Sequence, residues 1–452
     1  MRKSSSDLTV GSVAGQLLMF ALPILMGQIF QNLYNSVDAI VVGRNVGKTA
    51  LAAVSASTDI THLIVGFFTG LSNGAGILFA RTFGAKNYRK LHRAIHTSVT
   101  FSVIIGVAMA LTGVLITPLL LKLVACPADV FQEADAYLRI YFIGIMFTAI
   151  YNIGAGVLRS VGDSRNPFIY LVIASVVNII MDILFVVVLP LGVRGAALAT
   201  IVSQFLSVVL VFRRLIKTDD VYRLRLKELR IEMGLLREIM DLGIPAAIQA
   251  SLISISNMFV SRYINSFGSD AMAGIGAAKK IDKFVGMVAQ SVGQAIATFI
   301  SQNFGAKRLD RAFKSIRVAL LFDCAYILAI GSIIYINAEF FVRIFTTDEA
   351  AILFGIDMIH TMMPLYVMQC LNQTFANVVR GFGKSRVVML CSLSGMIVCR
   401  QIFLAISMYI DWNVRNIYYG YPVGWTCAAL FVFVYYYVTI HRKYWGERKA
   451  AV

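Results

Sequence analysis

The feature that most restricts the fold of this chain is a series of long apolar runs, each near the length of a helix that crosses a membrane. Such a helix needs about 20 mainly apolar residues, because the hydrocarbon layer is about 30 Å thick. The chain is 58% hydrophobic and 14% charged, whereas an average soluble domain carries about 25% charged residues. These proportions predict an all-α integral membrane protein.

Twelve spans are expected. They fall roughly at residues 13–42, 50–78, 94–121, 132–157, 167–190, 193–212, 236–262, 271–300, 316–337, 351–378, 387–410 and 418–440. The longest connection, residues 213–235, alternates in charge and predicts an amphipathic helix on the cytoplasmic surface. The first run is too long and too early for a cleaved signal peptide, so we expect it to remain in the membrane.

The distribution of Lys and Arg predicts the orientation of the chain. The N-terminus and every second loop hold 29 of these residues, and the other loops and span ends hold 7. Basic loops stay in the cytoplasm, so both termini are expected there, in a protein of the cell membrane. The net charge of +17 is then a topology signal and does not indicate a nucleic-acid partner. The six Cys and five His show no metal-ligand spacing, so neither metal nor other cofactor is expected.

Two short sequences recur at a fixed distance. ARTFGAK at 80–86 returns as SQNFGAK at 301–307, and LRSVGDSR at 158–165 returns as VRGFGKSR at 379–386. Both pairs are 221 residues apart and fall in predicted cytoplasmic loops. Two matches at one offset indicate an internal repeat.

The repeat predicts two six-helix bundles, an N-lobe at residues 1–225 and a C-lobe at 226–452. Because each half holds an even number of spans, both have the same orientation and are related by a pseudo-two-fold axis along the membrane normal. Pro23 and Pro245 open the first span of each half. Parallel repeats with paired interrupted helices are typical of transporters whose binding site lies between the halves.

The first span combines a hinge with an acid. Pro23 lacks a backbone donor, so the helix is expected to bend there. Asp38, about 22 Å further along the helix, is costly in hydrocarbon and is expected to face protein or water. Gln31 and Tyr34 share its face and are candidates for lining a cavity. The alternative is a purely structural, hydrogen-bonded Asp38.

The fifth span carries Asn178 and Asp182 one helical turn apart. Two acids in one half predict a shared pocket with Asp38, in which a proton or Na⁺ would relieve the repulsion. Candidate polar neighbours of this ion-coupling pair are Tyr137, Asn152 and Thr200. Such residues also join helices to one another, so a structural role stays open for each.

The second half has no acid in its first span. Lys279, Lys280 and Lys283 surround Asp282 in the eighth span, and Arg400 lies inside the eleventh. The favoured interpretation is an internal ion-pair network, with Asp323 and Asp357 as further partners, rather than a binding site. Uncharged candidates for lining a substrate cavity are Gln249, Asn257, Gln290, Gln294, Asn372 and Gln373.

These motifs together resemble one family. VDAIVVGR at 37–44, NIIMDILF at 178–185, the paired FGAK loops, RSVGDSR and the early prolines are similar to the MATE (multidrug and toxic compound extrusion) transporters, in the bacterial DinF- and MepA-like branch. The resemblance covers essentially the whole chain. It implies a V-shaped pair of lobes around a central cleft, and no enzyme activity. It also implies antiport: export of organic, drug-like and often cationic compounds in exchange for H⁺ or Na⁺.

The resemblance also assigns roles. The positions that match the family's functional residues are Asp38, Asn178 and Asp182 for the ion, Tyr137 and Thr200 around them, Pro23 at the bend, and Gln31 and Tyr34 in the N-lobe cavity. The sequence departs from the family in two places. It lacks the acids that another branch carries in spans seven and ten, and it has LFVV where many members have a proline after the acid of span five.

Two other functions are alternatives to export of organic compounds. A flippase for a lipid-linked saccharide, from the same superfamily, would favour extra spans and a strongly basic cavity; Arg400 and the lysines of span eight keep it open. An intramembrane transferase would need clustered acids for Mg²⁺, and the predicted loops offer only scattered ones. The leading expectation is a monomeric exporter of small amphiphilic, mainly cationic compounds.

Overall fold

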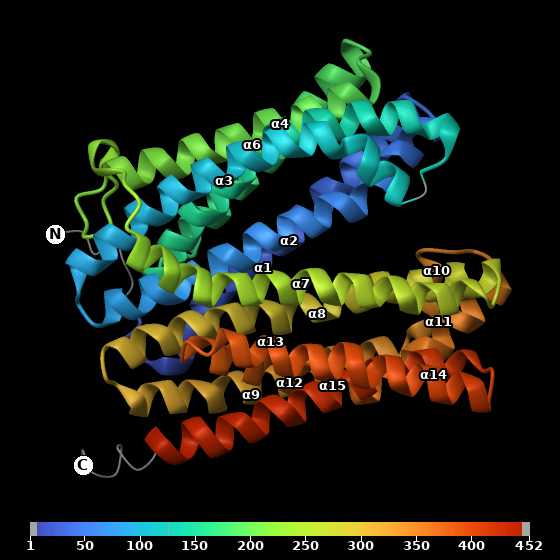
Figure 1. Cartoon of the computed structure of the whole chain (residues 1–452). Coiled ribbons are helices and arrows are strands. Elements are labelled where there is room, and N and C mark those ends of the chain that lie inside the picture. Colours follow the sequence, from blue (N-terminus) through green and yellow to red (C-terminus); the bar gives the residue numbers. More distant parts are fainter. Residues whose placement is uncertain (1–6, 125, 445–452) are drawn as a thin grey trace. The chain divides into compact units, whose positions relative to one another are not determined.

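The computed structural model describes residues 7–124 and 126–444, apart from the side chains of Lys48, Leu51 and Asp59. Within these residues, twelve helices are long and apolar enough to cross a membrane, as predicted, and all regular elements are helical (Figure 1). Arg2, Lys3, Arg448 and Lys449, which contribute to the charge count, lie outside the described residues.

The described chain forms two compact units. The first contains residues 7 and 23–247, and the second contains residues 8–22 and 248–444. The units therefore differ from the expected halves in two segments. The first helix changes unit at Pro23, and the seventh changes unit after Ala247.

The first unit is built around α4. Its helices are α1 (Val13–Asn45, from residue 23), α2 (Lys48–Gly84), α3 (Tyr88–Leu123), α4 (Ala128–Ser160), α5 (Arg165–Asp182), the π-helical segment η1 (Ile183–Val188) and α6 (Gly192–Lys217). Helix α4 packs against α2, α3 and α6. Glycines allow this close packing, since a Cβ at Gly113 of α3 would lie 2.0 Å from the Phe142 ring of α4. The opposite face of α3 exposes Leu111 and Leu115, which suits contact with lipid.

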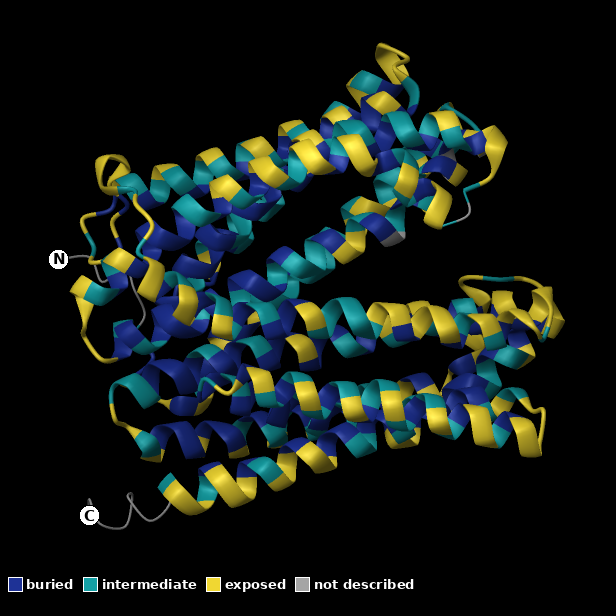
Figure 2. Ribbon diagram, viewed as in Figure 1, coloured by how far each residue is buried: buried dark blue, intermediate teal, exposed yellow. Residues whose placement is uncertain are grey.

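The second unit is built around α8 and α12. Its helices are α7 (Met233–Asn265, from residue 248), α8 (Ser269–Gly305), α9 (Leu309–Ile336), α10 (Ala338–Arg343), α11 (Glu349–Met362), η3 (Met363–Leu365), α12 (Tyr366–Gly381), α13 (Ser385–Leu393), η4 (Ser394–Cys399), α14 (Arg400–Ile410), α15 (Val414–Tyr435) and η5 (Tyr436–His441). Helix α8 packs against α9, α11 and α12, and α12 packs against α15. Buried residues concentrate on these contacting faces (Figure 2).

The loops of the two halves repeat the same backbone. Three pairs of residues, each 221 apart, have a positive φ: Gly47 (117°) and Gly268 (91°), Lys86 (55°) and Lys307 (58°), Gly162 (90°) and Gly383 (81°). A lysine in the left-handed region is uncommon, so its occurrence in both FGAK loops is not a general property of helix ends. The predicted repeat is therefore present in the local structure.

The linker between α6 and α7 is not the amphipathic helix that its charges predicted. Residues 218–232 are irregular, with one 3₁₀ turn, η2 (Leu226–Glu228). Tyr222 and Leu224 are fully buried, whereas Arg223 and Arg225 are exposed. This alternation has a period of two, which fits an extended chain and not a helix.

The start of α1 is held by the second unit. Arg311 of α9 donates to the carbonyls of Gly11 (2.6 Å) and Leu8 (3.1 Å) and to Oε1 of Gln16 (3.0 Å). Asn303 of α8 also donates to the carbonyl of Leu8 (3.2 Å). Leu8 is buried, so these donors satisfy a backbone carbonyl that has little access to water.

The start of α7 is held by the first unit in a similar way. Lys90 of α3 pairs with Glu238 at 2.8 Å, and Arg93 pairs with Glu232 just before α7. Helices α2 and α7 are also in close contact, because a Cβ at Gly74 would lie 2.3 Å from the Cα of Gly243. In each half, the third helix thus holds the first turns of the other half's first helix.

Candidate functional site

The first unit brings the two acids of the sequence motif together. Asp38 lies on α1 and is partly buried, and Asp182 is the last residue of α5 and is fully buried. The two carboxyl groups are close enough to interact electrostatically. Tyr34 of α1 and Tyr137 of α4 also lie close enough to both acids to interact with them electrostatically. These four side chains form the acidic site of the first unit.

The acidic site contains polar atoms without partners. Both carboxylate oxygens of Asp182, both polar atoms of the Asn178 side chain and Oδ1 of Asp38 are buried and make no hydrogen bond with the described residues. Each such group costs about 1–3 kcal/mol when unsatisfied. A proton shared by the acids, or a small cation bound by their oxygens, would remove both this cost and the charge repulsion.

The backbone changes where Asp182 ends α5. The π-helical segment η1 follows at once, at Ile183–Val188. This segment contains LFVV, the second of the two places where the sequence departs from the pattern that it resembles. A π-helical turn is wider than an α-helical one and is frequent at functional sites. No motif in the sequence predicted this segment.

Two tyrosines of the site were missed by the sequence analysis. Tyr141 stacks on Tyr137, with ring centroids 6.2 Å apart, and lies within electrostatic range of Tyr34. Tyr151 also lies within range of Tyr34, and its hydroxyl donates to the carbonyl of Pro167 at 3.2 Å. The i, i+4 spacing of Tyr137 and Tyr141 was the available signal. Gln31, in contrast, was predicted to share a face with Tyr34, and the two side chains are hydrogen-bonded.

Two residues that were predicted as polar neighbours of the acids form hydrogen bonds within their own helices instead. The Thr200 hydroxyl donates to the carbonyl of Ala196 at 3.1 Å, and Nδ2 of Asn152 donates to the carbonyl of Thr148 at 2.8 Å. Their donors are therefore directed at the backbone and not at Asp38 or Asp182. Back-bonding of this kind is usual for such residues inside helices.

Pro23 lies inside α1, which remains helical through it. It is also the residue at which α1 passes from the second unit to the first. Pro245 has a comparable place in α7, two residues before that helix changes unit. Each proline therefore removes one backbone hydrogen bond close to the point where a helix leaves one compact unit for the other.

Arg400 takes no part in an ion pair with any described residue, in contrast to the network predicted for this half. This guanidinium is 2% exposed. It donates to Oδ1 of Asn257 (2.9 Å) and Oγ of Ser256 (2.5 Å), and it lies 5.5 Å from the centre of the Tyr421 ring. Neutral hydrogen-bond acceptors and an aromatic face thus take the place of acids, because α7 and α15 bring these groups to α14.

The acids of the second unit have partners of their own. Asp282 accepts a hydrogen bond from the Tyr366 hydroxyl, and Asp323 accepts one from Thr374 at 2.7 Å. Asp357 forms an ion pair with Arg415 at 2.8 Å. Lys279 lies within electrostatic range of Asp282, as its place on the helix predicted, and its Nζ is 5.7 Å from the Tyr421 ring centre. Lys280 Nζ is 5.2 Å from the Phe345 ring centre, and Lys283 is exposed.

The uncharged cavity candidates of this unit differ in exposure. Asn257 and Gln290 are exposed, Gln249, Gln294 and Gln373 are half-buried, and Asn372 is buried. Gln249 accepts a hydrogen bond from Arg380 at 3.0 Å. Asn372 donates weakly to the sulfur of Met396 at 3.8 Å, while its Oδ1 has no partner among the described residues.

Comparison with known proteins agrees with this arrangement. The MatE family pattern matches the chain twice, at residues 23–184 and 245–406. The second match begins and ends 222 residues after the first, which is one residue more than the offset of the paired loops. Each match starts at one of the two prolines.

Similar proteins cover nearly the whole chain. The "Probable multidrug resistance protein YoeA" of Bacillus subtilis is 27% identical over 96% of this chain and 95% of its own length. The "Multidrug export protein MepA" of Staphylococcus haemolyticus is 19% identical over 94% of both.

A solved structure has the same fold. It is described as the outward-facing conformation of a multidrug resistance MATE family transporter of the MOP superfamily. It matches with a TM-score of 0.89 at 22% identity, over 96% of this chain and 97% of that one. Two family matches, twelve membrane helices and this fold lead to one conclusion: the chain is a multi-pass membrane protein that belongs to the MATE family of transporters, and it is not an enzyme.

Proposed function

We propose that the chain is a secondary active antiporter, which exports organic compounds in exchange for H⁺ or Na⁺ taken up at the acidic site. The names of its relatives, a multidrug resistance protein and a multidrug export protein, support drug-like substrates. The observation that carries the proposal is the set of buried, unpartnered polar atoms on Asp38, Asn178 and Asp182. Intramembrane acids in this state mark ion pathways.

The coupling mechanism follows from the position of Asp38 on α1. A ligand shifts a conformational equilibrium only if it binds the two states unequally. An ion at Asp38 cancels the repulsion by Asp182 and changes the most favourable position of this part of α1. The helix can respond, because Pro23 has already removed a hydrogen bond from its ladder. The substrate then favours the state that lacks the ion.

The proposed transporter has both termini in the cytoplasm and carries small cations outward. The excess of Lys and Arg in alternate loops supports cytoplasmic termini in the cell membrane, with export directed outward. Acids in the membrane interior favour small amphiphilic cations over anions. The transporter acts as a monomer, because each chain holds both halves of the repeat.

The flippase alternative is less well supported. It relied on basic side chains that face a cavity, and Arg400 was its main candidate. Both terminal nitrogens of Arg400 already donate to Asn257 and Ser256. A guanidinium with these donors in use is poorly placed to bind a diphosphate in the bidentate manner that favours Arg.

The test is transport by purified protein in liposomes with an imposed H⁺ or Na⁺ gradient, read by movement of a cationic dye. We expect one gradient to drive export by the wild type. Asp38→Asn should abolish it, because Asn imitates the neutral state permanently. Asp323→Asn is the matched control, since Asp323 is a buried acid of the other unit: its Oδ2 accepts a hydrogen bond from Thr374, and its Oδ1, like that of Asp38, has no partner among the described residues. Wild-type export by Asp38→Asn at equal amounts of protein would remove Asp38 from the coupling mechanism.

A further inference from the structure

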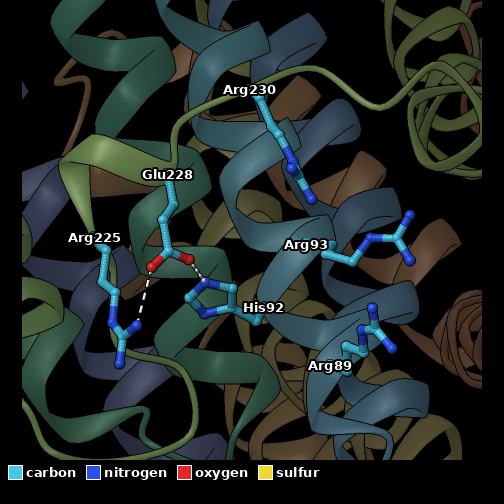
Figure 3. Close-up of a pocket in the computed structure, with 6 residues that line it drawn as sticks. All are labelled: Arg89, His92, Arg93, Arg225, Glu228 and Arg230. Atoms are coloured by element: carbon cyan, nitrogen blue, oxygen red, sulfur yellow. Dashed lines mark hydrogen bonds and ion pairs between the residues drawn. The ribbon is translucent and has the colours of Figure 1, made fainter.

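The start of α3 and the linker that precedes α7 form a basic pocket away from the acidic site. Its volume is about 510 Å³, and its lining residues are Arg89, His92, Arg93, Arg225, Glu228 and Arg230. Figure 3 shows Arg89, Arg93 and Arg230 on one side of the His92–Glu228 pair and Arg225 on the other. All six belong to the first unit. The volume is within the range of about 300–1,000 Å³ that is common for ligand sites.

The pocket keeps an excess of positive charge after its ion pairs are counted. Glu228 pairs with Arg225 at 2.9 Å and with His92 at 2.6 Å. The hydrogen bond from His92, followed by that from Arg225, lowers the pKa of Glu228 to about 2, so this carboxylate is ionised. Glu232 pairs with Arg93 and Arg230. Four guanidinium groups thus face two carboxylates, which leaves two positive charges in excess when His92 is neutral.

Arg89 is the arginine of the pocket whose charge is least neutralised. It is exposed, and no ion pair of Arg89 occurs within the described residues. It lies in the first turn of α3, which begins at Tyr88. The positive end of the helix dipole adds to the attraction for an anion near this first turn. The pocket therefore combines two sources of positive potential.

A metal ion is a poorer occupant. His92, His96 and Glu228 are close enough to share one. However, Nε2 of His96 accepts a hydrogen bond from the backbone N–H of Arg225 at 3.0 Å, so this nitrogen carries no proton. The proton is then on Nδ1, which donates to the carbonyl of His92 at 2.7 Å. Neither nitrogen of His96 has a lone pair left for a metal.

The surroundings of the pocket indicate that its anion is part of a lipid. Leu226 and Ile231 directly follow the pocket residues Arg225 and Arg230, and both are exposed. Met233, at the start of α7, is 60% exposed. Large apolar side chains beside a basic pocket, at the end of a membrane helix, are typical of a surface that enters the headgroup region of a bilayer.

We propose that this pocket binds the phosphate headgroup of an anionic phospholipid, whose acyl chains extend past Leu226, Ile231 and Met233. Arg89 supplies a charge that has no ion pair among the described residues, Arg230 shares Glu232 with Arg93, and Arg225 holds Glu228. Because Arg93 also holds Glu232 before α7, a bound lipid joins α3, the linker and the start of α7. This site is independent of the transported compound and of the coupling ion.

The test compares lipid binding to the full-length protein in a neutral detergent, by native mass spectrometry and by thermal stabilisation. The probes are dioctanoyl phosphatidylglycerol, dioctanoyl phosphatidylcholine with the same chains, and glycerol 3-phosphate without chains. The pocket variant is Arg89→Gln with Arg230→Gln. The control is Lys86→Gln with Lys227→Gln, which removes the same charge from exposed neighbours that do not line the pocket.

We expect phosphatidylglycerol to bind about 30-fold more weakly to the pocket variant, because each basic residue contributes a factor of roughly five near an anionic lipid. The control variant should stay within about twofold of the wild type, and phosphatidylcholine should bind weakly to all three. Equal loss in both variants would show a general charge effect and overturn the site. Glycerol 3-phosphate that binds as tightly as the lipid would assign the pocket to a free phosphate instead.

Discussion

Buried charges are treated differently in the two units. In the first unit, Asp38 and Asp182 lie near each other, and three of their oxygens have no partner among the described residues. In the second unit, Arg400 is hydrogen-bonded to two side chains and lies against an aromatic ring. Both Asp182 and Arg400 are almost fully buried, and each lies next to a π-helical segment. Neither burial nor backbone conformation therefore distinguishes a functional charge from a structural one.

The difference indicates which charges serve function. Arg400 has no like charge beside it among the described residues, and its two terminal nitrogens are hydrogen-bonded, although its Nε has no partner there; such a charge stabilises one arrangement of its helices. A pair of like charges without partners destabilises the arrangement unless something binds, so its occupancy changes the energy of the protein. We therefore expect substitutions in the first unit to affect transport and those in the second to affect stability. Four predictions test this comparison, in order of decreasing effect.

The largest effect is expected for Asp182→Asn. It should reduce gradient-driven export to the background of empty liposomes, because one of the two ion-binding carboxylates is lost. The thermal unfolding midpoint in detergent should stay the same or rise, since the repulsion of Asp38 is removed. A clear fall in this midpoint would mean that Asp182 is structural, which would break the comparison.

The next effect is expected at the anchor of α1. Arg311→Ala removes hydrogen bonds from a charged donor to Gly11, Leu8 and Gln16. Each bond to a charged group contributes about 1.5–3 kcal/mol, so the free energy of unfolding should fall by several kcal/mol.

Lys90→Ala is the matched control for Arg311→Ala. Its ion pair with Glu238 is partly exposed, and exposed pairs contribute about 0–1 kcal/mol. Unfolding in detergent, followed by tryptophan fluorescence, measures both variants. Similar losses in the two would contradict the distinction between buried and exposed anchors.

A smaller effect is expected for Arg400→Gln. Glutamine keeps one donor for Ser256 or Asn257 but loses the charge and the contact with Tyr421. The free energy of unfolding should fall by about 1.5–3 kcal/mol, with more than half of the export activity retained in the protein that remains folded. Export lost without any loss of stability would place Arg400 in the transport pathway and revive the flippase alternative.

The smallest effect is expected for Thr200→Val. Its hydroxyl is bonded to the carbonyl of Ala196 in its own helix, so the change should alter export by less than about twofold and stability by less than about 1 kcal/mol. Family resemblance predicted a role near the ion. A loss of export comparable to that of Asp38→Asn would show that Thr200 turns toward the carboxylates during transport.

Much of the candidate site could be predicted from the sequence. The i, i+4 spacing of Asn178 and Asp182 and the helical face shared by Gln31 and Tyr34 are local properties, and the structure reproduces both. The residues that interact with them across helices were harder to predict. Tyr151 has no charge and no motif, and the spacing of Tyr141 from Tyr137 says nothing about Tyr34. Their positions near Tyr34 depend on how α1 packs in the first unit.

The linker shows why charge patterns can mislead. Its alternating charges predicted an amphipathic helix, but Tyr222 and Leu224 are buried at a spacing of two residues. The backbone N–H of Leu224 donates to the carbonyl of Leu215, at the end of α6. Burial of two large apolar side chains contributes about 1.5–3 kcal/mol each. This contribution, and not helix propensity, determines the conformation of the short segment.

The sequence by itself determined the number of spans, the repeat, the positions of the acids and the family, because hydropathy, spacing and motifs are properties of short stretches of chain. The tertiary structure alone decided which buried charges have partners. It also decided that the first turns of α1 and α7 belong to the opposite unit, and that α3 and the linker enclose a basic pocket. These features depend on contacts between residues far apart in the chain, such as Arg311 with Leu8, whose free energy exists only once the helices have packed.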